Sequence, residues 1–137
     1  MTHPKTIVLI VEDDEIWRQS LASTLITDGK MIVHTAPDAH TALALLQKHP
    51  EIRVVITDNH LGAGLNGVEL IRTLQTRPAW AALSFILHHG DCEKTLRVQL
   101  KDVLRLRFVS KVRPHSVDII LAIHSLVGST ATENFVG

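Results

Sequence analysis

Five short apolar runs recur along the chain, and segments with apolar residues three or four apart lie between them. The runs cover residues 6–11, 31–35, 53–58, 84–87 and 106–109. Runs of this length that are rich in Val and Ile are typical of strands buried on both faces of a sheet. The pattern therefore predicts five buried strands.

The segments between the runs have the spacing of helices. Trp17, Leu21 and Leu25 follow one another at intervals of four, and this helix is expected to stop near residue 28. Further helices are expected at residues 37–49, 68–76, 92–101 and 114–127. Strands that alternate with helices over short connections imply a parallel sheet with helices on both faces. The expected fold is α/β, a doubly wound, flavodoxin-like sheet of five parallel strands in the order 2-1-3-4-5.

Length and composition limit the number of domains, the kinds of partner and the cellular compartment that are expected. The 137 residues suit one domain, expected at residues 1–127, with residues 128–137 as a disordered C-terminal tail. Fourteen basic and fourteen acidic residues give zero net charge, which does not favour direct binding to nucleic acid or a membrane surface. The single cysteine, Cys92, excludes an internal disulfide, and the start of the chain does not resemble a secretory signal. We expect a soluble cytoplasmic protein.

Carboxylates gather at the ends of two predicted strands. The first strand runs into Glu12 and Asp13, and the third ends at Asp58 before a glycine-rich loop at residues 59–67. In the expected order these strands are neighbours, so the three carboxylates meet at the carboxyl edge of the sheet, where ligands bind in such folds. Taken singly, Asp58 is equally compatible with a turn cap, and the other acids with an ordinary helix N-terminus. The joint placement is what indicates a site.

Three carboxylates in one crevice repel one another, and a bound cation relieves the repulsion. Oxygen ligands suit a hard divalent ion, and Mg²⁺ usually takes one or two carboxylates together with phosphate oxygens. An aspartate such as Asp58 can also attack phosphorus to form an aspartyl phosphate. Lys111, at the end of the fifth strand, is a candidate for the positive charge that phosphoryl transfer needs, although in isolation it fits an ordinary surface lysine as well.

Three short motifs, in this order, resemble the receiver domain of two-component response regulators. They are VLIVEDD at residues 8–14, VITD at residues 55–58 with GVEL at residues 67–70, and FVSK at residues 108–111. The resemblance covers residues 5–127. It implies that Asp58 is the phosphoacceptor.

The same resemblance implies the metal ligands. Asp13 would bind Mg²⁺ directly and Glu12 through water, while Asp14 would be only a first-turn acid. The third ligand would be the backbone carbonyl of His60, two residues after Asp58.

The remaining implications concern signalling. Lys111 would contact the phosphoryl oxygens, and Phe108 would be the aromatic whose rotation reports phosphorylation. The implied partners are a histidine kinase or phosphotransfer protein and a downstream protein effector, and a homodimer is compatible with the pattern. The protein would accept the phosphoryl group itself and would not be an enzyme that turns over an external substrate.

The chain departs from the family pattern at several positions. His89, which lies 22 residues before Lys111, stands where the family has a Thr or Ser hydroxyl. Its imidazole either donates to a phosphoryl oxygen or points to solvent. Val112 replaces the usual proline, and because a cis bond before valine costs roughly 3 kcal/mol, a trans peptide is expected. Gly62 stands in the approximate place of another usual proline.

Other functions stay open at this stage. The main alternative is a degenerate receiver that binds proteins without phosphorylation, as His89 and Val112 suggest. A phosphatase with an aspartate nucleophile would have a second aspartate at position 60, and a flavin binder would have a phosphate-binding loop after the first strand in place of acids. A transition-metal site of His60, His88 and His89 is disfavoured, because adjacent residues of a strand point in opposite directions.

Overall fold

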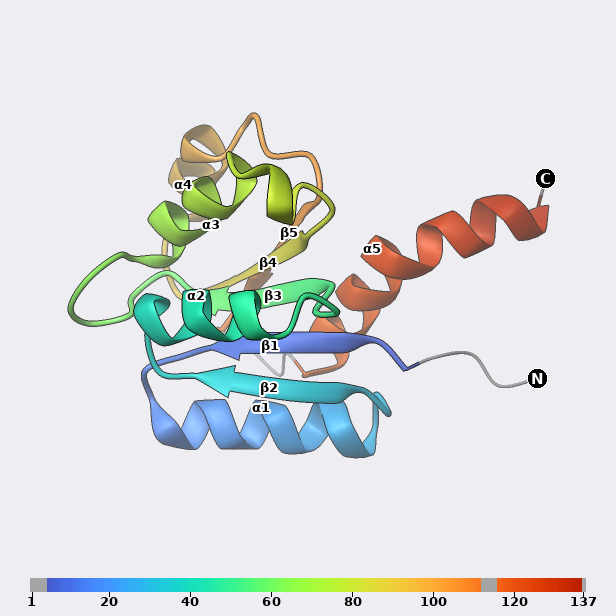
Figure 1. The fold of residues 1–137 in the computed structure, drawn as a ribbon, viewed down its shortest axis with the longest axis horizontal. Coiled ribbons are helices and arrows are strands. Elements are labelled where there is room, and N and C mark those ends of the chain that lie inside the picture. The colour runs from blue at the N-terminus through green and yellow to red at the C-terminus, as the bar shows by residue number, and fades with distance from the viewer. Residues whose placement is uncertain (1–4, 112–115, 137) are drawn as a thin grey trace.

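The computed structural model describes residues 5–111 and 116–136, in which strands and helices alternate along the chain. The strands form one parallel sheet in the order β2-β1-β3-β4-β5, which confirms the predicted fold (Figure 1). The elements are β1 (Ile7–Val11), α1 (Glu15–Thr27), β2 (Ile32–Ala36), α2 (Ala39–Lys48), β3 (Val54–Asp58), α3 (Gly67–Gln75), the 3-10 turn η1 (Pro78–Trp80), β4 (Ser84–His89), α4 (Glu93–Gln99), β5 (Leu106–Ser110) and α5 (Ser116–Val136).

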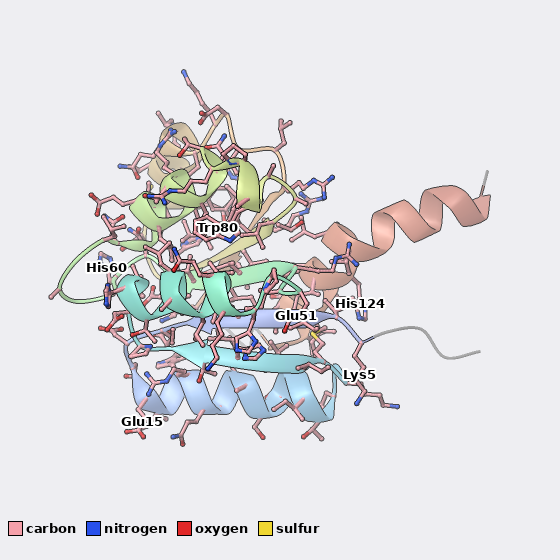
Figure 2. All side chains as sticks on the ribbon, viewed as in Figure 1. Lys5, Glu15, Glu51, His60, Trp80 and His124 are labelled. Atoms are coloured by element: carbon pink, nitrogen blue, oxygen red, sulfur yellow. The ribbon has the colours of Figure 1, made fainter. Side chains whose placement is uncertain are left out.

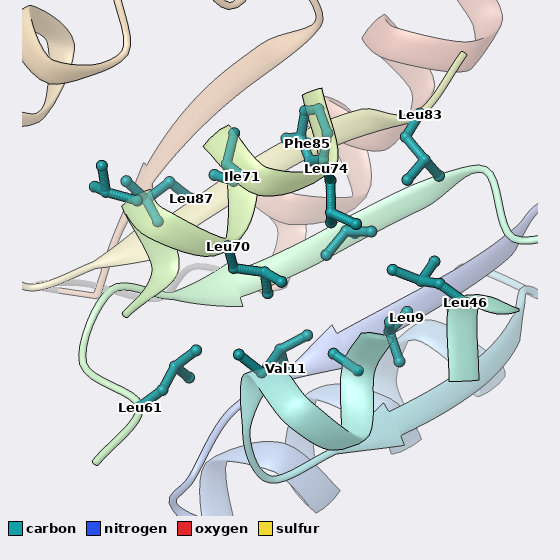
Figure 3. Packing of buried hydrophobic residues seen from close by; sticks show 14 of the residues in the cluster. Leu9, Val11, Leu46, Leu61, Leu70, Ile71, Leu74, Leu83, Phe85 and Leu87 are labelled. Atoms are coloured by element: carbon teal, nitrogen blue, oxygen red, sulfur yellow. The ribbon is translucent and has the colours of Figure 1, made fainter. Parts of the chain in front are cut away.

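Two apolar cores sandwich the sheet, because successive residues of a strand point to opposite faces. In β1, Leu9 packs into a core covered by α2, α3 and α4, whereas Val8 and Ile10 pack beneath α1 and α5. Figure 3 shows the first of these cores, in which Leu46 of α2 and Leu70 of α3 lie over the strands. Central strands must therefore be apolar on both faces, which explains the uninterrupted runs in the sequence.

Most of the observed boundaries lie within two residues of those predicted, and the largest difference among the strands is at the end of β4. This strand continues through His88 and His89, two residues past the predicted end. The backbone explains the difference, since His88 pairs with Asp58 on one side and His89 with Ser110 on the other. Backbone pairing extends the strand although its last two side chains are polar.

Helix α5 is longer than the sequence pattern indicated. The predicted end was residue 127, but the helix runs to Val136 and extends away from the sheet (Figure 1). The division into a domain at residues 1–127 and a tail stays a prediction. The peptide between Lys111 and Val112, expected to be trans, lies outside the described residues. Within the described parts of the chain, no helix is both long enough and apolar enough to cross a membrane.

Candidate functional site

Three carboxylates form an acidic pocket at the carboxyl edge of the sheet. Donor oxygens of Glu12, Asp13 and Asp58 all lie within 4.8 Å of one another. Val11 pairs with Thr57 in the β1–β3 register, so the residues that follow them leave the sheet side by side. Glu12 and Asp58 are buried and Asp13 is exposed. The sheet thus brings together the three acids that the strand order predicted to meet.

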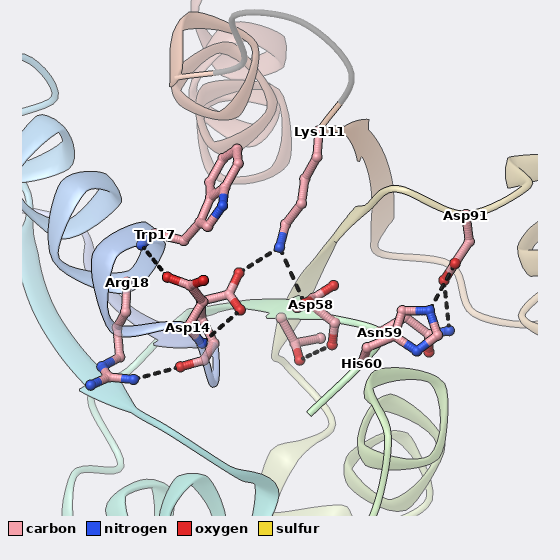
Figure 4. Close-up of polar contacts among 10 residues, drawn as sticks. Asp14, Trp17, Arg18, Asp58, Asn59, His60, Asp91 and Lys111 are labelled. Carbon is pink, nitrogen blue, oxygen red and sulfur yellow. Dashed lines mark hydrogen bonds and ion pairs between the residues drawn. The ribbon is translucent and has the colours of Figure 1, made fainter. Parts of the chain in front are cut away.

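Lys111 reaches this acidic pocket from the end of β5. Its Nζ lies 2.6 Å from Oε1 of Glu12 and 3.2 Å from Oδ2 of Asp58 (Figure 4). Only 17% of the lysine side chain is exposed, so the interpretation as an ordinary surface lysine is wrong. The ammonium group spans a gap between two buried carboxylates whose charges it offsets.

Burial and charge shift the pKa values of this pair. Burial raises the pKa of Glu12, the nearby charge of Asp58 raises it further, and the hydrogen bond from Lys111 opposes the rise. Burial lowers the pKa of Lys111, but its hydrogen bond to Glu12 and the charge of Asp58 outweigh burial, so the net pKa is raised. The lysine is therefore held in its charged form beside the acids.

The start of α1 fixes the position of Glu12. Its Oε2 accepts a hydrogen bond from the backbone N–H of Asp14 at 3.2 Å, and its carbonyl accepts one from Arg18 at 2.8 Å. The side chain of Asp14 caps the helix by accepting from the N–H of Trp17 at 3.0 Å. Asp14 therefore serves the first turn of α1 and not the acidic pocket, as the sequence indicated.

Gly67 fixes the backbone of Asp58. Its N–H donates to the carbonyl of Asn59 at 2.9 Å, and α3 begins at this glycine after the Asn66 cap. A Cβ on Gly67 would lie 2.9 Å from Cα of Asn59 and would collide with the carbonyl oxygen of Asp58. The close approach of α3 to the end of β3 therefore requires glycine at this position.

The response regulator receiver domain family matches residues 8–113 of this sequence. The chain belongs to this family.

Solved structures agree with this assignment. A signal receiver domain of an HD domain-containing protein from Pseudomonas fluorescens Pf-5 superposes with a TM-score of 0.80 at 24% identity, covering 94% of this chain and 99% of that one. A response regulator receiver protein from Pseudomonas putida gives 0.79 at 25% identity, with 90% and 99% covered. The chemotaxis protein CheY4 of Vibrio cholerae gives 0.80 at 21% identity, with 90% and 100% covered. No curated protein sequence matches the chain.

Trp17 is a part of this receiver's site that sequence reasoning missed. Nζ of Lys111 lies 4.9 Å from the centroid of the Trp17 ring, close enough for a cation–π interaction, and the ring of His88 meets the indole edge-on at 5.7 Å. The sequence pattern used Trp17 only for its helical spacing with Leu21 and Leu25. Only the two leucines are fully buried. No sequence signal distinguished the indole from the core residues that follow it.

Asp91 is a second residue that the sequence did not single out. Its Oδ1 lies 2.8 Å from Nε2 of His60, and its Oδ2 accepts a hydrogen bond from Asn59 at 3.1 Å (Figure 4). The hydrogen bond with Asp91 raises the pKa of His60, and the same bond lowers the pKa of Asp91. The contacts of Asp91 with Asn59 and His60 connect the loop after β3 to the loop after β4. The role of the His60 carbonyl as a metal ligand stays a prediction.

His89 is buried and does not point to solvent, so that alternative is wrong. It is 2% exposed, with Nδ1 at 3.2 Å from the carbonyl of Asp91 and Nε2 at 3.3 Å from Oε1 of Glu93. Its ring meets that of Phe108 edge-on, with the centroids 6.1 Å apart. Because β4 continues through His89, the imidazole is held against the start of α4.

Phe108 is linked to this same cluster. The guanidinium of Arg97 lies 4.6 Å from the centroid of the phenylalanine ring, and the same Arg97 pairs with Glu93 at 2.8 Å. A continuous series of side-chain contacts therefore leads from His89 through Glu93 and Arg97 to Phe108. The role of Phe108 as a switch stays a prediction, but its contact with the residue at the family's hydroxyl position is a feature of the structure.

The cluster of three histidines that the sequence disfavoured does not form. His60 pairs with Asp91, His89 bonds to Asp91 and Glu93, and His88 packs against Trp17. Across residues 5–111 and 116–136, neither group of side chains able to share a metal ion includes any of these histidines. The opposite orientations of neighbouring strand residues account for this result.

Proposed function

We propose that Asp58 of this receiver domain accepts a phosphoryl group from a histidine kinase or phosphotransfer protein, with Mg²⁺ as cofactor. The observation that carries the proposal is the position of Lys111, whose ammonium group lies between Glu12 and Asp58. A buried cation beside a nucleophilic carboxylate is the arrangement that phosphoryl transfer needs, because charge develops on the phosphoryl oxygens.

The acidic pocket fits the proposed metal. It offers carboxylate oxygens and no softer donor, which suits Mg²⁺. Asp13 and Asp58 would hold the ion directly, together with the carbonyl of His60, and Glu12 would hold it through water. When bound, Mg²⁺ neutralises charge on the phosphoryl oxygens.

The proposed step is a displacement at phosphorus. A carboxylate oxygen of Asp58 forms a bond to phosphorus while the bond from phosphorus to the donor nitrogen breaks. The leaving imidazole keeps that electron pair and takes up a proton from solvent. Lys111, already 3.2 Å from Asp58, moves from Glu12 toward the new phosphoryl oxygens. The protein is the acceptor of the group and does not turn over an external substrate.

The face made by α4, β5 and α5 is the proposed surface for the downstream effector, or for a second copy in a homodimer. A hollow of about 450 Å³ lies there, between Glu93 at the start of α4 and Asp118 of α5, with Phe108 in its wall. Leu121 and Ala122 supply apolar contact area in the same hollow. A change in the orientation of the Phe108 ring would thus alter a surface that a protein partner can recognise. We propose a cytoplasmic protein without direct contact with nucleic acid or membrane.

The test is intact mass after incubation with Mg²⁺ and acetyl phosphate, beside an Asp58→Asn control. We expect one added phosphoryl group that is absent from the control and absent without Mg²⁺. An Asp14→Asn variant is a matched acid control that retains the adduct, because Asp14 caps α1. An adduct of equal yield in Asp58→Asn would refute the proposal.

One observation favours a second candidate, a degenerate receiver that binds partners without phosphorylation. His89 replaces the family's hydroxyl, and both of its ring nitrogens lie within hydrogen-bond distance of Asp91 or Glu93. Absence of any adduct, together with no binding of a beryllium-fluoride phosphate mimic, would support this candidate. Recovery of the adduct in His89→Thr would assign the loss to this single substitution.

A further inference from the structure

A second group of metal-binding side chains lies outside the acidic pocket. His34 belongs to β2, and His49 and Glu51 belong to the connection between α2 and β3. One donor atom from each lies within 4.8 Å of the other two. The imidazole rings are stacked with centroids 4.3 Å apart, and Nδ1 of His49 lies 3.2 Å from Oε2 of Glu51.

This group is distant from Asp58, which lies at the carboxyl ends of the strands. In the register, His34 pairs with Leu9 in the middle of β1, and His49 follows the end of α2, close to where β3 begins. The acidic pocket, in contrast, lies where the strands end. Figure 2 shows Glu51 on the α2 side of the sheet, well separated from the loop that carries His60. Neither histidine has a part in the proposed phosphoryl transfer.

The surroundings lower the pKa of His34 and leave the group open to an ion from solvent. Burial lowers the pKa of His34, and the neighbouring His49 lowers it further. Imidazole binds a metal ion in its deprotonated form, which this lowering favours. The side chains of His49 and Glu51 remain 27% and 48% exposed, which leaves an approach from solvent.

We propose that His34, His49 and Glu51 form a binding site for a divalent transition-metal ion of the Zn²⁺ class. Two imidazoles and one carboxylate, with a fourth position for water, are a known three-residue ligand set for zinc. Imidazole prefers such ions to Mg²⁺, which separates this site from the all-oxygen acidic pocket.

Binding needs a small local rearrangement. With bonds of about 2.0–2.1 Å to zinc, tetrahedral donor atoms are about 3.3 Å apart, so the widest pair must close by at most about 1.5 Å. The imidazoles must also tilt out of their stack so that their lone pairs converge on the ion. A bound ion would link the edge strand β2 to the α2–β3 connection and raise the melting temperature.

The experiment is calorimetric titration of the full, tag-free chain with Zn²⁺, alongside His34→Ala, His49→Ala and Glu51→Gln. His40→Ala is the matched control, since it removes an exposed histidine of α2 that lies outside the group. Each titration is repeated in an Asp13→Asn background, which separates this site from the acidic pocket. Melting curves without metal establish that each variant is folded, and Glu51→Gln serves as the mildest substitution.

We expect one Zn²⁺ per chain, with affinity at least about tenfold weaker in each of the three ligand variants and unchanged in His40→Ala and Asp13→Asn. NMR signals of two imidazoles should shift together during the titration. Absence of binding would overturn the proposal, as would an affinity of His34→Ala or His49→Ala equal to that of the unsubstituted protein. An equal loss of affinity in His40→Ala, or a loss of Zn²⁺ binding caused by Asp13→Asn itself, would also overturn it. None of these results depends on whether Asp58 is phosphorylated.

Discussion

Nζ of Lys111 lies 2.6 Å from Oε1 of Glu12, closer than it lies to Oδ2 of Asp58, the proposed phosphoacceptor, at 3.2 Å. Glu12 is 4% exposed and needs a neighbouring positive charge to be stable in its ionised form. In the metal-free domain the lysine supplies that charge. In the proposed mechanism, a cation in the acidic pocket would neutralise Glu12 in place of Lys111, and the lysine could then contact the phosphoryl oxygens.

The substitution Lys111→Met should test whether Lys111 neutralises the buried carboxylates when no metal is bound. Without the ammonium group two buried carboxylates lose their counter-charge, and we expect the free energy of unfolding without metal to fall by about 2 kcal/mol. Added Mg²⁺ should restore most of the loss, as measured by urea unfolding at two Mg²⁺ concentrations. Lys101→Met removes an exposed lysine and is the control. A loss of stability that Mg²⁺ leaves unchanged would contradict this account.

Asp13 offers a test of the metal site alone. Because it lies beside two other carboxylates, Asp13→Ala should stabilise the metal-free domain, by up to about 1 kcal/mol. We expect Mg²⁺ to raise the melting temperature of the unsubstituted protein, and Asp13→Ala should lose this rise. Asp14→Asn should keep that rise, since asparagine also caps a helix. An undiminished Mg²⁺ response in Asp13→Ala would place the ion elsewhere.

Trp17 should report events in the acidic pocket through its fluorescence. The ammonium group of Lys111 lies 4.9 Å from its ring, so any movement of the lysine changes the electric field at the indole. We expect a Mg²⁺-dependent change in emission that disappears in Trp17→Phe. The other tryptophan, Trp80, lies in η1 beside Arg77, and Trp80→Phe should retain the change. If the signal followed Trp80 instead, the proposed movement of Lys111 would lose its support.

Packing at Gly67 fixes the position of Asp58, the proposed phosphoacceptor. Gly67→Ala must push α3 away from the end of β3, because its Cβ has no room beside Asp58 and Asn59. We expect a loss of about 1–3 kcal/mol in unfolding free energy and a lower yield of the aspartyl phosphate. Gly90→Ala adds the same methyl group where no atom lies within 4 Å, so both quantities should stay near those of the parent. Equal effects of the two variants would show that the close contact is unimportant.

Much of this protein could be predicted from local pattern. The apolar runs specify buried strands, because a strand covered on both faces has no position for an exposed polar side chain. Alternation with helices then specifies the parallel order, and the order brings Glu12 and Asp13 next to Asp58. The fold and the acidic pocket therefore follow from spacing along the chain.

Contacts between side chains distant in sequence could not be predicted in the same way. The sequence left open whether His89 faces solvent, and the pairing of β4 with β5 decided that it is buried against Phe108. It gave no reason to connect His34 with His49, whose rings stack only because α2 returns the chain to the side of β2. Periodicity specifies which face of an element is apolar, but a contact depends on how two elements meet. Only the tertiary structure fixes that arrangement, because packing of the whole core sets the distance and angle between them.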